Sequence, residues 1–212
     1  MEMFWAVIVS VILILIIYGK PFRITNIRAG RKESCLLRQH LTAVNAAARV
    51  GCAEITGAEI SSRELTFSPQ TILAGHHSFA VGTAGSATLA LQTVLPALML
   101  ADGPSTLTLE GGTHNPFAPP FDFLARVFLP LINRMGASVT ATLERAGFYP
   151  AGGGKFEVAI KPAAKLERLD LNERGEVINK GARAMIANLP ESIARAGSFE
   201  SSRRNFRGKT SG

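Results

Sequence analysis

Residues 36–56 have the sequence LLRQHLTAVNAAARVGCAEIT, and this stretch sets the fold class. Across 36–50 the apolar residues recur every three or four positions, which is the spacing of one face of a helix. Gly51 follows at the position where a helix commonly ends. The next residues, 53–56, alternate between apolar and polar, as a half-buried strand does. The stretch therefore predicts a helix, a stop glycine and a strand.

The same order occurs twice more along the chain. A second helix is expected over 86–100 (SATLALQTVLPALML) before a strand at 106–109, with Pro96 expected to kink or end the helix. A third helix is expected over 121–135 before a strand at 138–142. Three such repeats predict an α/β (α+β) fold of repeated βα units, with the helices on one side of mixed sheets.

The two ends of the chain differ from its middle. Met3–Tyr18 (MFWAVIVSVILILIIY) is apolar apart from one serine, and about sixteen residues is marginal for spanning a bilayer. One interpretation is a membrane anchor, with the following basic residues holding the body in the cytoplasm. The other is a helix that packs on the core, partly buried, which we prefer for a cytoplasmic protein. Residues 200–212 are polar and basic and predict a disordered tail.

The composition narrows the function classes. The chain has 212 residues, with 47% hydrophobic and 18% charged, so an intrinsically disordered protein is excluded. Lys+Arg 23 against Asp+Glu 16 gives a net charge of +7, which favours an anionic partner such as RNA or a nucleotide. Cys35 and Cys52 have neither the spacing of a zinc site nor that of a disulfide framework, and no metal site is predicted.

Several motifs could bind phosphate. Arg28 and Arg31 lie at the end of a strand predicted at 22–28, and each guanidinium group can make two charge-assisted hydrogen bonds to phosphoryl oxygens. Gly82–Ser86 (GTAGS) leads from a strand into a helix, where a helix N-terminus can hold a phosphate. From spacing alone, a solvated basic loop and tight structural turns are equally good interpretations. His76 and His77 are expected in a polar surface turn.

Two further loops are rich in glycine and proline: GGTHNPFAPP at 111–120 and GFYPAGGG at 147–154. With IRAGR, LLRQHLTAV and GTAGSATLALQTVLPAL, they make the chain resemble the RNA 3′-terminal phosphate cyclase family from about Lys20 to Phe199. The resemblance implies an enzyme of the ligase class that uses ATP, with a divalent cation such as Mg²⁺, to convert an RNA 3′-phosphate to a 2′,3′-cyclic phosphate. It implies an adenylylated histidine and an adenylylated RNA as intermediates.

The resemblance also suggests roles for individual residues. It implies that Gln92 contacts the nucleotide, although a lone glutamine on an apolar helix is otherwise typical of a buried core residue. The residues expected near the phosphates or the RNA end are Arg28, Arg31, Arg38 and Gln39. No catalytic residue is assigned, because none of the four histidines matches the family nucleophile, which lies in a C-terminal part beyond the matched region.

The resemblance divides the chain as follows: an atypical apolar segment at 1–18, a cyclase-like repeat domain at 19–172, the start of a smaller inserted domain at 173–199 and the tail at 200–212. Altered or truncated ends would explain the mismatch with the family at both termini. The alternative function is a non-catalytic protein that binds RNA and nucleotide, in which residues 3–18 associate with a membrane. The sequence does not predict an oligomeric state.

Overall fold

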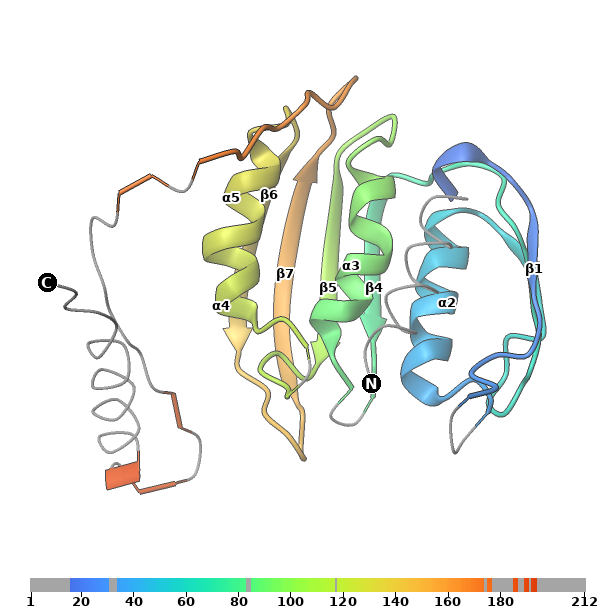
Figure 1. Cartoon of the computed structure of the whole chain (residues 1–212), viewed down its shortest axis with the longest axis horizontal. Helices are drawn as coiled ribbons and strands as arrows, with labels where there is room; N and C mark the ends of the chain where they lie inside the picture. The colour runs from blue at the N-terminus through green and yellow to red at the C-terminus, as the bar shows by residue number, and fades with distance from the viewer. Residues whose placement is uncertain are drawn as a thin grey trace, which may run out of the picture. The chain divides into compact units, whose positions relative to one another are not determined.

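A computed structural model describes residues 16–30, 34–82, 85–116, 118–173, 175–176, 185–186, 189–190 and 192–193. The chain divides into two compact units, Met1–Leu169 and Asp170–Gly212. The first unit is an α/β structure with helices, an antiparallel sheet and a mixed sheet, so the predicted fold class is confirmed (Figure 1). In the second unit the described residues include a turn in which the Ile193 N–H donates to the Pro190 carbonyl at 3.1 Å.

The first unit begins with a small antiparallel module. Strands β1 (Phe22–Ile24), β3 (Leu65–Ser68) and β2 (Glu54–Thr56) form a sheet in the order β1-β3-β2. Helix α2 (Arg38–Val50) lies between β1 and β2 in sequence. We call these four elements the first module. Strand β1 ends at Ile24, so the strand predicted at 22–28 is four residues shorter than expected.

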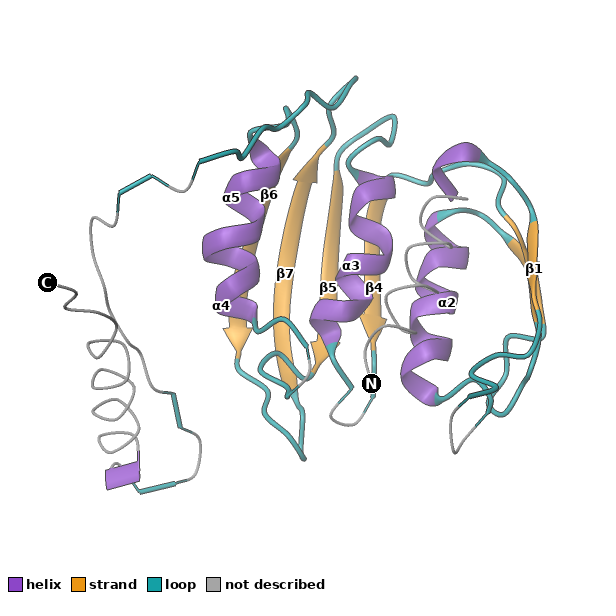
Figure 2. Ribbon diagram, in the orientation of Figure 1, coloured by secondary structure: helices purple, strands orange, loops and turns teal. Residues whose placement is uncertain are grey.

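The second module is a four-stranded sheet with helices over one face. Its strands are β4 (Gly75–Ala80), β5 (Ser105–Gly111), β7 (Gly154–Lys161) and β6 (Ser138–Arg145), in that spatial order. Strands β4 and β5 are parallel, and the other neighbours are antiparallel. Figure 2 shows α3 (Ala87–Leu98), α4 (Phe121–Phe123) and α5 (Leu129–Asn133) on one face, with the π-helical segment η1 (Leu124–Phe128) joining the last two.

The two modules repeat the same pattern. In the first, strand, helix, strand, strand gives β1-α2-β2-β3 with the sheet order β1-β3-β2. In the second, β5, the helical segment α4–η1–α5, β6 and β7 give the corresponding order β5-β7-β6. The repeat seen in the sequence is therefore a strand-helix-strand-strand unit. The second module adds β4 and α3 ahead of it.

Both modules share one core. Helices α2 and α3 pack against each other, and the buried cluster joins residues from both sheets and both helices. Among the largest fully buried side chains are Phe67 of β3, Leu91 of α3 and Phe156 of β7. Apolar side chains recur at every second position of β7 toward the helices, as a half-buried strand requires.

One local expectation was wrong, because His76 and His77 lie in β4 rather than in a turn, and His77 is buried. Pro96, which was expected to kink or end the helix, does not end α3, since the Met99 N–H still donates to the Leu95 carbonyl at 2.9 Å.

Most of the apolar N-terminal segment lies outside the described residues. Its last residues form a helical turn, in which Ile16 is buried and Tyr18 is 71% exposed. In the part of the chain that the structure describes, no helix has the length and apolar character needed to cross a bilayer. The predicted tail, residues 200–212, also lies outside the described residues.

Candidate functional site

Three glycine-rich loops meet at one edge of the four-stranded sheet. Strands β4, β5 and β6 all run in the same direction, because β4 is parallel to β5 and β7 is antiparallel to both β5 and β6. These three strands therefore end at the same edge of the sheet, where β7 begins. We call the described residues of the loops after β4, β5 and β6 (81–82, 85–86, 112–116, 118–120 and 146–153) the glycine-loop edge. The motifs that were singled out in the sequence therefore come together in space.

Backbone hydrogen bonds join the first two loops. The Gly112 N–H donates to the Gly85 carbonyl at 2.7 Å, and the Ala87 N–H donates to the Gly112 carbonyl at 2.9 Å. Helix α3 starts here, with the Ser86 hydroxyl accepting from the Leu89 N–H at 3.3 Å as an N-cap. The Thr88 hydroxyl donates to the Pro119 carbonyl at 2.8 Å, so α3 is also tied to the loop after β5.

The second and third loops meet at Thr113 and Gly147. The Gly147 carbonyl accepts from the N–H groups of Thr113 and His114, at 2.9 and 3.1 Å. The Gly147 N–H donates to the Thr113 hydroxyl at 2.9 Å. No side chain fits at Gly147, because a Cβ there would lie 2.6 Å from the Gly111 carbonyl oxygen. Glycine is required at this junction by close backbone approach.

His114 connects this junction to the start of the next helical segment. Its Nδ1 lies 2.8 Å from the Thr113 hydroxyl, and its Nε2 lies 3.1 Å from Asp122 Oδ2. Arg126 Nε lies 3.2 Å from the other carboxylate oxygen of Asp122. The ring stacks on Phe148 at 5.3 Å between centroids. The sequence assigned no role to these side chains, although the eight-residue spacing of His114 and Asp122 across a proline-rich loop was a usable signal.

Positive charge lies around the start of α2. Arg38 is exposed in the first turn, and a Cβ on Gly82 would lie 3.8 Å from its Cδ, so its stem runs beside the loop after β4. Arg28 donates from Nη1 to the Cys35 carbonyl at 3.3 Å. Burial lowers the pKa of His40 to about 4, and the positive charge of Arg28 contributes to that shift. The His40 ring caps α2, because its Nδ1 accepts from the Leu37 N–H at 3.1 Å.

The other predicted residues stand as follows. Gln92 is exposed in the second turn of α3, so its interpretation as a buried core residue is wrong. Its carbonyl lacks the usual helical donor, because Pro96 has no N–H. Gln39 lies in the first turn of α2, but its side chain is outside the described part of the structure, as is the whole of Arg31.

The described residues do not build a metal site. Among them, no group of three or more His, Cys, Asp or Glu side chains is placed to hold a metal ion. Asp122 of α4, which lies next to the loop after β5, already interacts with His114 and Arg126.

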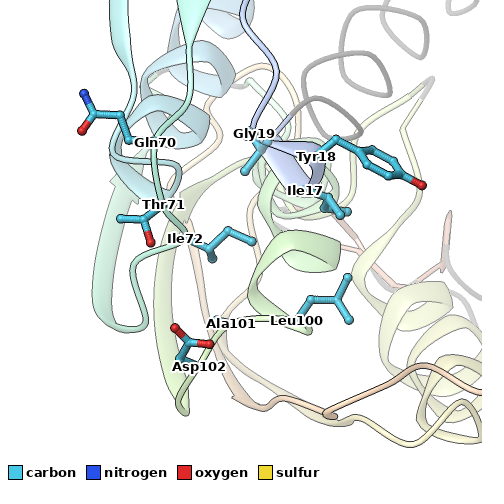
Figure 3. Close-up of a pocket in the computed structure, with 10 residues that line it drawn as sticks. Ile17, Tyr18, Gly19, Gln70, Thr71, Ile72, Leu100, Ala101 and Asp102 are labelled. Carbon is cyan, nitrogen blue, oxygen red and sulfur yellow. The ribbon is translucent and has the colours of Figure 1, made fainter.

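A separate pocket of about 330 Å³ lies at the other end of the parallel strands (Figure 3). It is lined by Ile16–Gly19, Gln70–Ile72 and Leu100–Asp102. The lining contains no Lys, Arg or His, and its one ionisable acid, Asp102, is exposed. This pocket is therefore a poor phosphate site, and the glycine-loop edge is the better candidate.

The chain is similar to known proteins over most of its length. Residues 7–200 match the family model described as RNA 3′-terminal phosphate cyclase. The chain is 60% identical over 176 residues to the RNA 3′-terminal phosphate cyclase of Koribacter versatilis (strain Ellin345). That alignment covers 83% of this chain and 50% of the relative, so the chain spans about half the length of the curated relative it matches.

Proposed function

This chain belongs to the RNA 3′-terminal phosphate cyclase family, and on that premise we propose that it acts in the ATP-dependent cyclisation of RNA 3′-phosphates. In that reaction AMP is passed from an adenylylated histidine to the RNA 3′-phosphate. The neighbouring 2′-hydroxyl then attacks the activated phosphorus, loses its proton and expels AMP. The chemistry needs a site that holds two phosphate-bearing partners together.

The observation that carries the proposal is the junction of three glycine-rich loops beside Arg38. Glycine lets the backbone approach a polyanion closely, and the guanidinium supplies two charge-assisted hydrogen bonds. Helix α3 begins at the same edge, where the positive end of its dipole favours an anion. We assign phosphate or RNA-end binding to Arg28, Arg31, Arg38 and Gln39, and nucleotide contact to Gln92.

None of the chain's own histidines is proposed as the nucleophile. An attacking imidazole needs a ring nitrogen that is free and accessible to the nucleotide. His40 and His77 are buried, and both ring nitrogens of His114 are engaged. His76 is exposed, but it lies at the start of β4, at the end of the strand away from the glycine-loop edge. This arrangement favours the second candidate function, in which the chain alone binds nucleotide and RNA without chemistry.

Nucleotide binding is tested by calorimetry with ATP and Mg²⁺. Gln92→Ala should weaken binding about tenfold, which corresponds to about 1.4 kcal/mol for a lost hydrogen bond to a charged or polar ligand group. Gln70→Ala is the matched control, because Gln70 is an exposed glutamine at the other end of the sheet. Equal ATP affinity in the wild type and Gln92→Ala would contradict the assignment.

The two functions are separated by labelled ATP. A competent cyclase retains the label of [α-³²P]ATP covalently and converts an RNA 3′-phosphate to its cyclic ester. A binding protein retains the label only non-covalently. Either outcome requires tighter binding to a 3′-phosphate RNA end than to a 3′-hydroxyl end.

We further propose a cytoplasmic location, with the apolar segment 3–18 packed on the core. Membrane association through that segment is the alternative. Alkaline carbonate extraction distinguishes them: the chain should be released from membranes, and retention would favour the anchor.

A further inference from the structure

His114 belongs to a network of hydrogen bonds that runs from Asp122 to Gly147. The donor and acceptor in each bond follow from the groups at the two ends of the network. The Asp122 carboxylate only accepts, so the His114 Nε2, 3.1 Å away, carries the proton that it donates. At the other end the Gly147 N–H donates to the Thr113 oxygen. The Thr113 O–H has two acceptors within reach, His114 Nδ1 at 2.8 Å and the Gly147 carbonyl at 3.4 Å, and the shorter contact favours donation to His114. With its proton on Nε2, the His114 ring donates to Asp122 and accepts from Thr113.

This chain of bonds joins three segments that are far apart in sequence. Thr113 and His114 belong to the loop after β5, and Gly147 belongs to the loop after β6. Asp122 belongs to α4, and Arg126 of η1 holds its other oxygen. Phe148, in the loop after β6, stacks on the His114 ring and so adds a further contact between the two loops.

The Thr113–His114 part of the network is shielded from water, whereas the Asp122 side chain is 31% exposed. Thr113 is 1% exposed, and the His114 side chain is 9% exposed. Hydrogen bonds in such surroundings are stronger than in water, and losing one partner leaves the others unsatisfied. A ring held at both nitrogens cannot also bind a substrate atom. His114 therefore affects the site only through the groups it holds.

We propose that His114 is a positioning residue that fixes the loops after β5 and β6 in the geometry needed for the nucleotide phosphates. This inference rests on the proposed function, because it concerns the same edge of the sheet. What the inference adds is the tautomer of His114 and the rigidity that its hydrogen bonds give to the two loops.

The tautomer is measured on the wild-type protein by ¹⁵N NMR of the imidazole. We expect the ring to carry a proton on Nε2 and to accept at Nδ1. Thr113→Val should remove the hydrogen bond and change the Nδ1 shift. A ring protonated on Nδ1, or a Nδ1 shift unchanged by Thr113→Val, would overturn the inference.

The positioning effect is measured with variants of His114. His114→Ala should raise amide hydrogen exchange in residues 147–154 and weaken ATP binding at least tenfold. His114→Gln, whose amide N–H can still reach Asp122, should recover part of both. His76→Ala is the matched control, because His76 is an exposed histidine of the same sheet that also contacts a threonine hydroxyl. Loop protection and ATP affinity equal to wild type in His114→Ala would overturn the inference.

The two proposals fail separately. If the wild-type chain does not bind ATP, the proposed function fails, while the tautomer and the loop exchange still decide the role of His114. If ATP binds but His114→Ala behaves like wild type, only the positioning role fails.

Discussion

At the scale of single residues, Gly147 shows a requirement that composition alone could not establish. A Cβ at this position would lie 2.6 Å from both the Gly111 carbonyl oxygen and the Gly154 Cα. Gly147→Ala should therefore destabilise the fold by about 2–4 kcal/mol, since backbone rather than a flexible side chain must move. Gly30→Ala is the control, because a Cβ on Gly30 meets nothing within 4 Å. Urea unfolding would measure both, and equal midpoints would contradict this account.

His40 gives the fold a pH dependence whose direction follows from its burial. Burial, and then the charge of Arg28, lowers its pKa from 6.5 to about 4. Between these values the unfolded chain binds a proton on His40 that the folded protein does not. The stability contribution of the neutral ring is thus complete above pH 6.5 and is lost as the pH falls toward 4, by at most about 1.4 kcal/mol per pH unit.

His40→Asn tests this dependence. The amide oxygen can still accept from the Leu37 N–H but does not titrate, so the free energy of unfolding should fall less between pH 7 and pH 4.5 than in the wild type. His77, whose pKa burial also lowers, is present in both proteins and cancels in the comparison. Identical pH profiles for the two proteins would rule out His40 as the source.

At the scale of elements, periodicity predicted the long helices and the strands that follow them. It found α2 and α3 within two residues at each end, because their apolar faces recur over three or more turns. It missed β3, which has four residues, and it placed His76 and His77 in a turn, because two polar imidazoles hide the alternation that buries His77 and Phe79. It also missed β7, whose GKFEVAIK alternation was present but was not used.

The site was only partly predictable for a related reason. The glycine-rich loops stand out in the sequence, but their meeting depends on the strand order β4-β5-β7-β6. The bond from Gly147 to Thr113 spans 34 residues, and no local pattern indicates it. The arginines were visible as charges, and only the fold places Arg38 beside Gly82.

The helical segment α4–η1–α5 leaves apolar side chains in solvent. Phe123 and Val127 are each 45% exposed, and Phe128 is 37% exposed. With Gly136 aligned on Gly51, Phe128 corresponds to Ala43 of α2, which is 3% exposed, whereas Phe123 and Val127 correspond to Arg38 and Thr42. At Phe123 and Val127 the second module therefore places apolar side chains where its counterpart has polar ones.

Replacing Phe123 and Val127 together by glutamine should reduce self-association, because exposed apolar patches promote it. The cost in stability should stay near 0.5 kcal/mol per substitution, as is usual for exposed positions. Light scattering and thermal unfolding measure the two effects. Phe121→Gln is the contrast: it is buried against Phe156 and should cost about 3–5 kcal/mol. Unchanged self-association in the double variant would show that this face is not responsible.

At the scale of the whole molecule, the net charge of +7 does not say where RNA would bind. The fold suggests where to look, because Arg38 lies beside the glycine-loop edge and Arg28 near the start of the same helix. Other cations lie elsewhere: β7 carries Lys161 at its carboxyl end, the opposite edge of the sheet, and Lys165 and Arg168 follow. Two sets of three cations can therefore be removed with the same change in net charge, +7 − 3 = +4.

The salt dependence of RNA binding separates local from overall electrostatics. Each phosphate neutralised on a single strand contributes about −0.7 to the slope of log K against log salt concentration. If Arg28, Arg31 and Arg38 each contact a phosphate, replacing all three by alanine should make the slope shallower by roughly 2. Replacing Lys161, Lys165 and Arg168 should leave the slope near that of the wild type, although the net charge falls equally. Equal slopes for the two triple variants would mean that RNA responds to the overall charge and that the cluster at α2 is only a solvated surface.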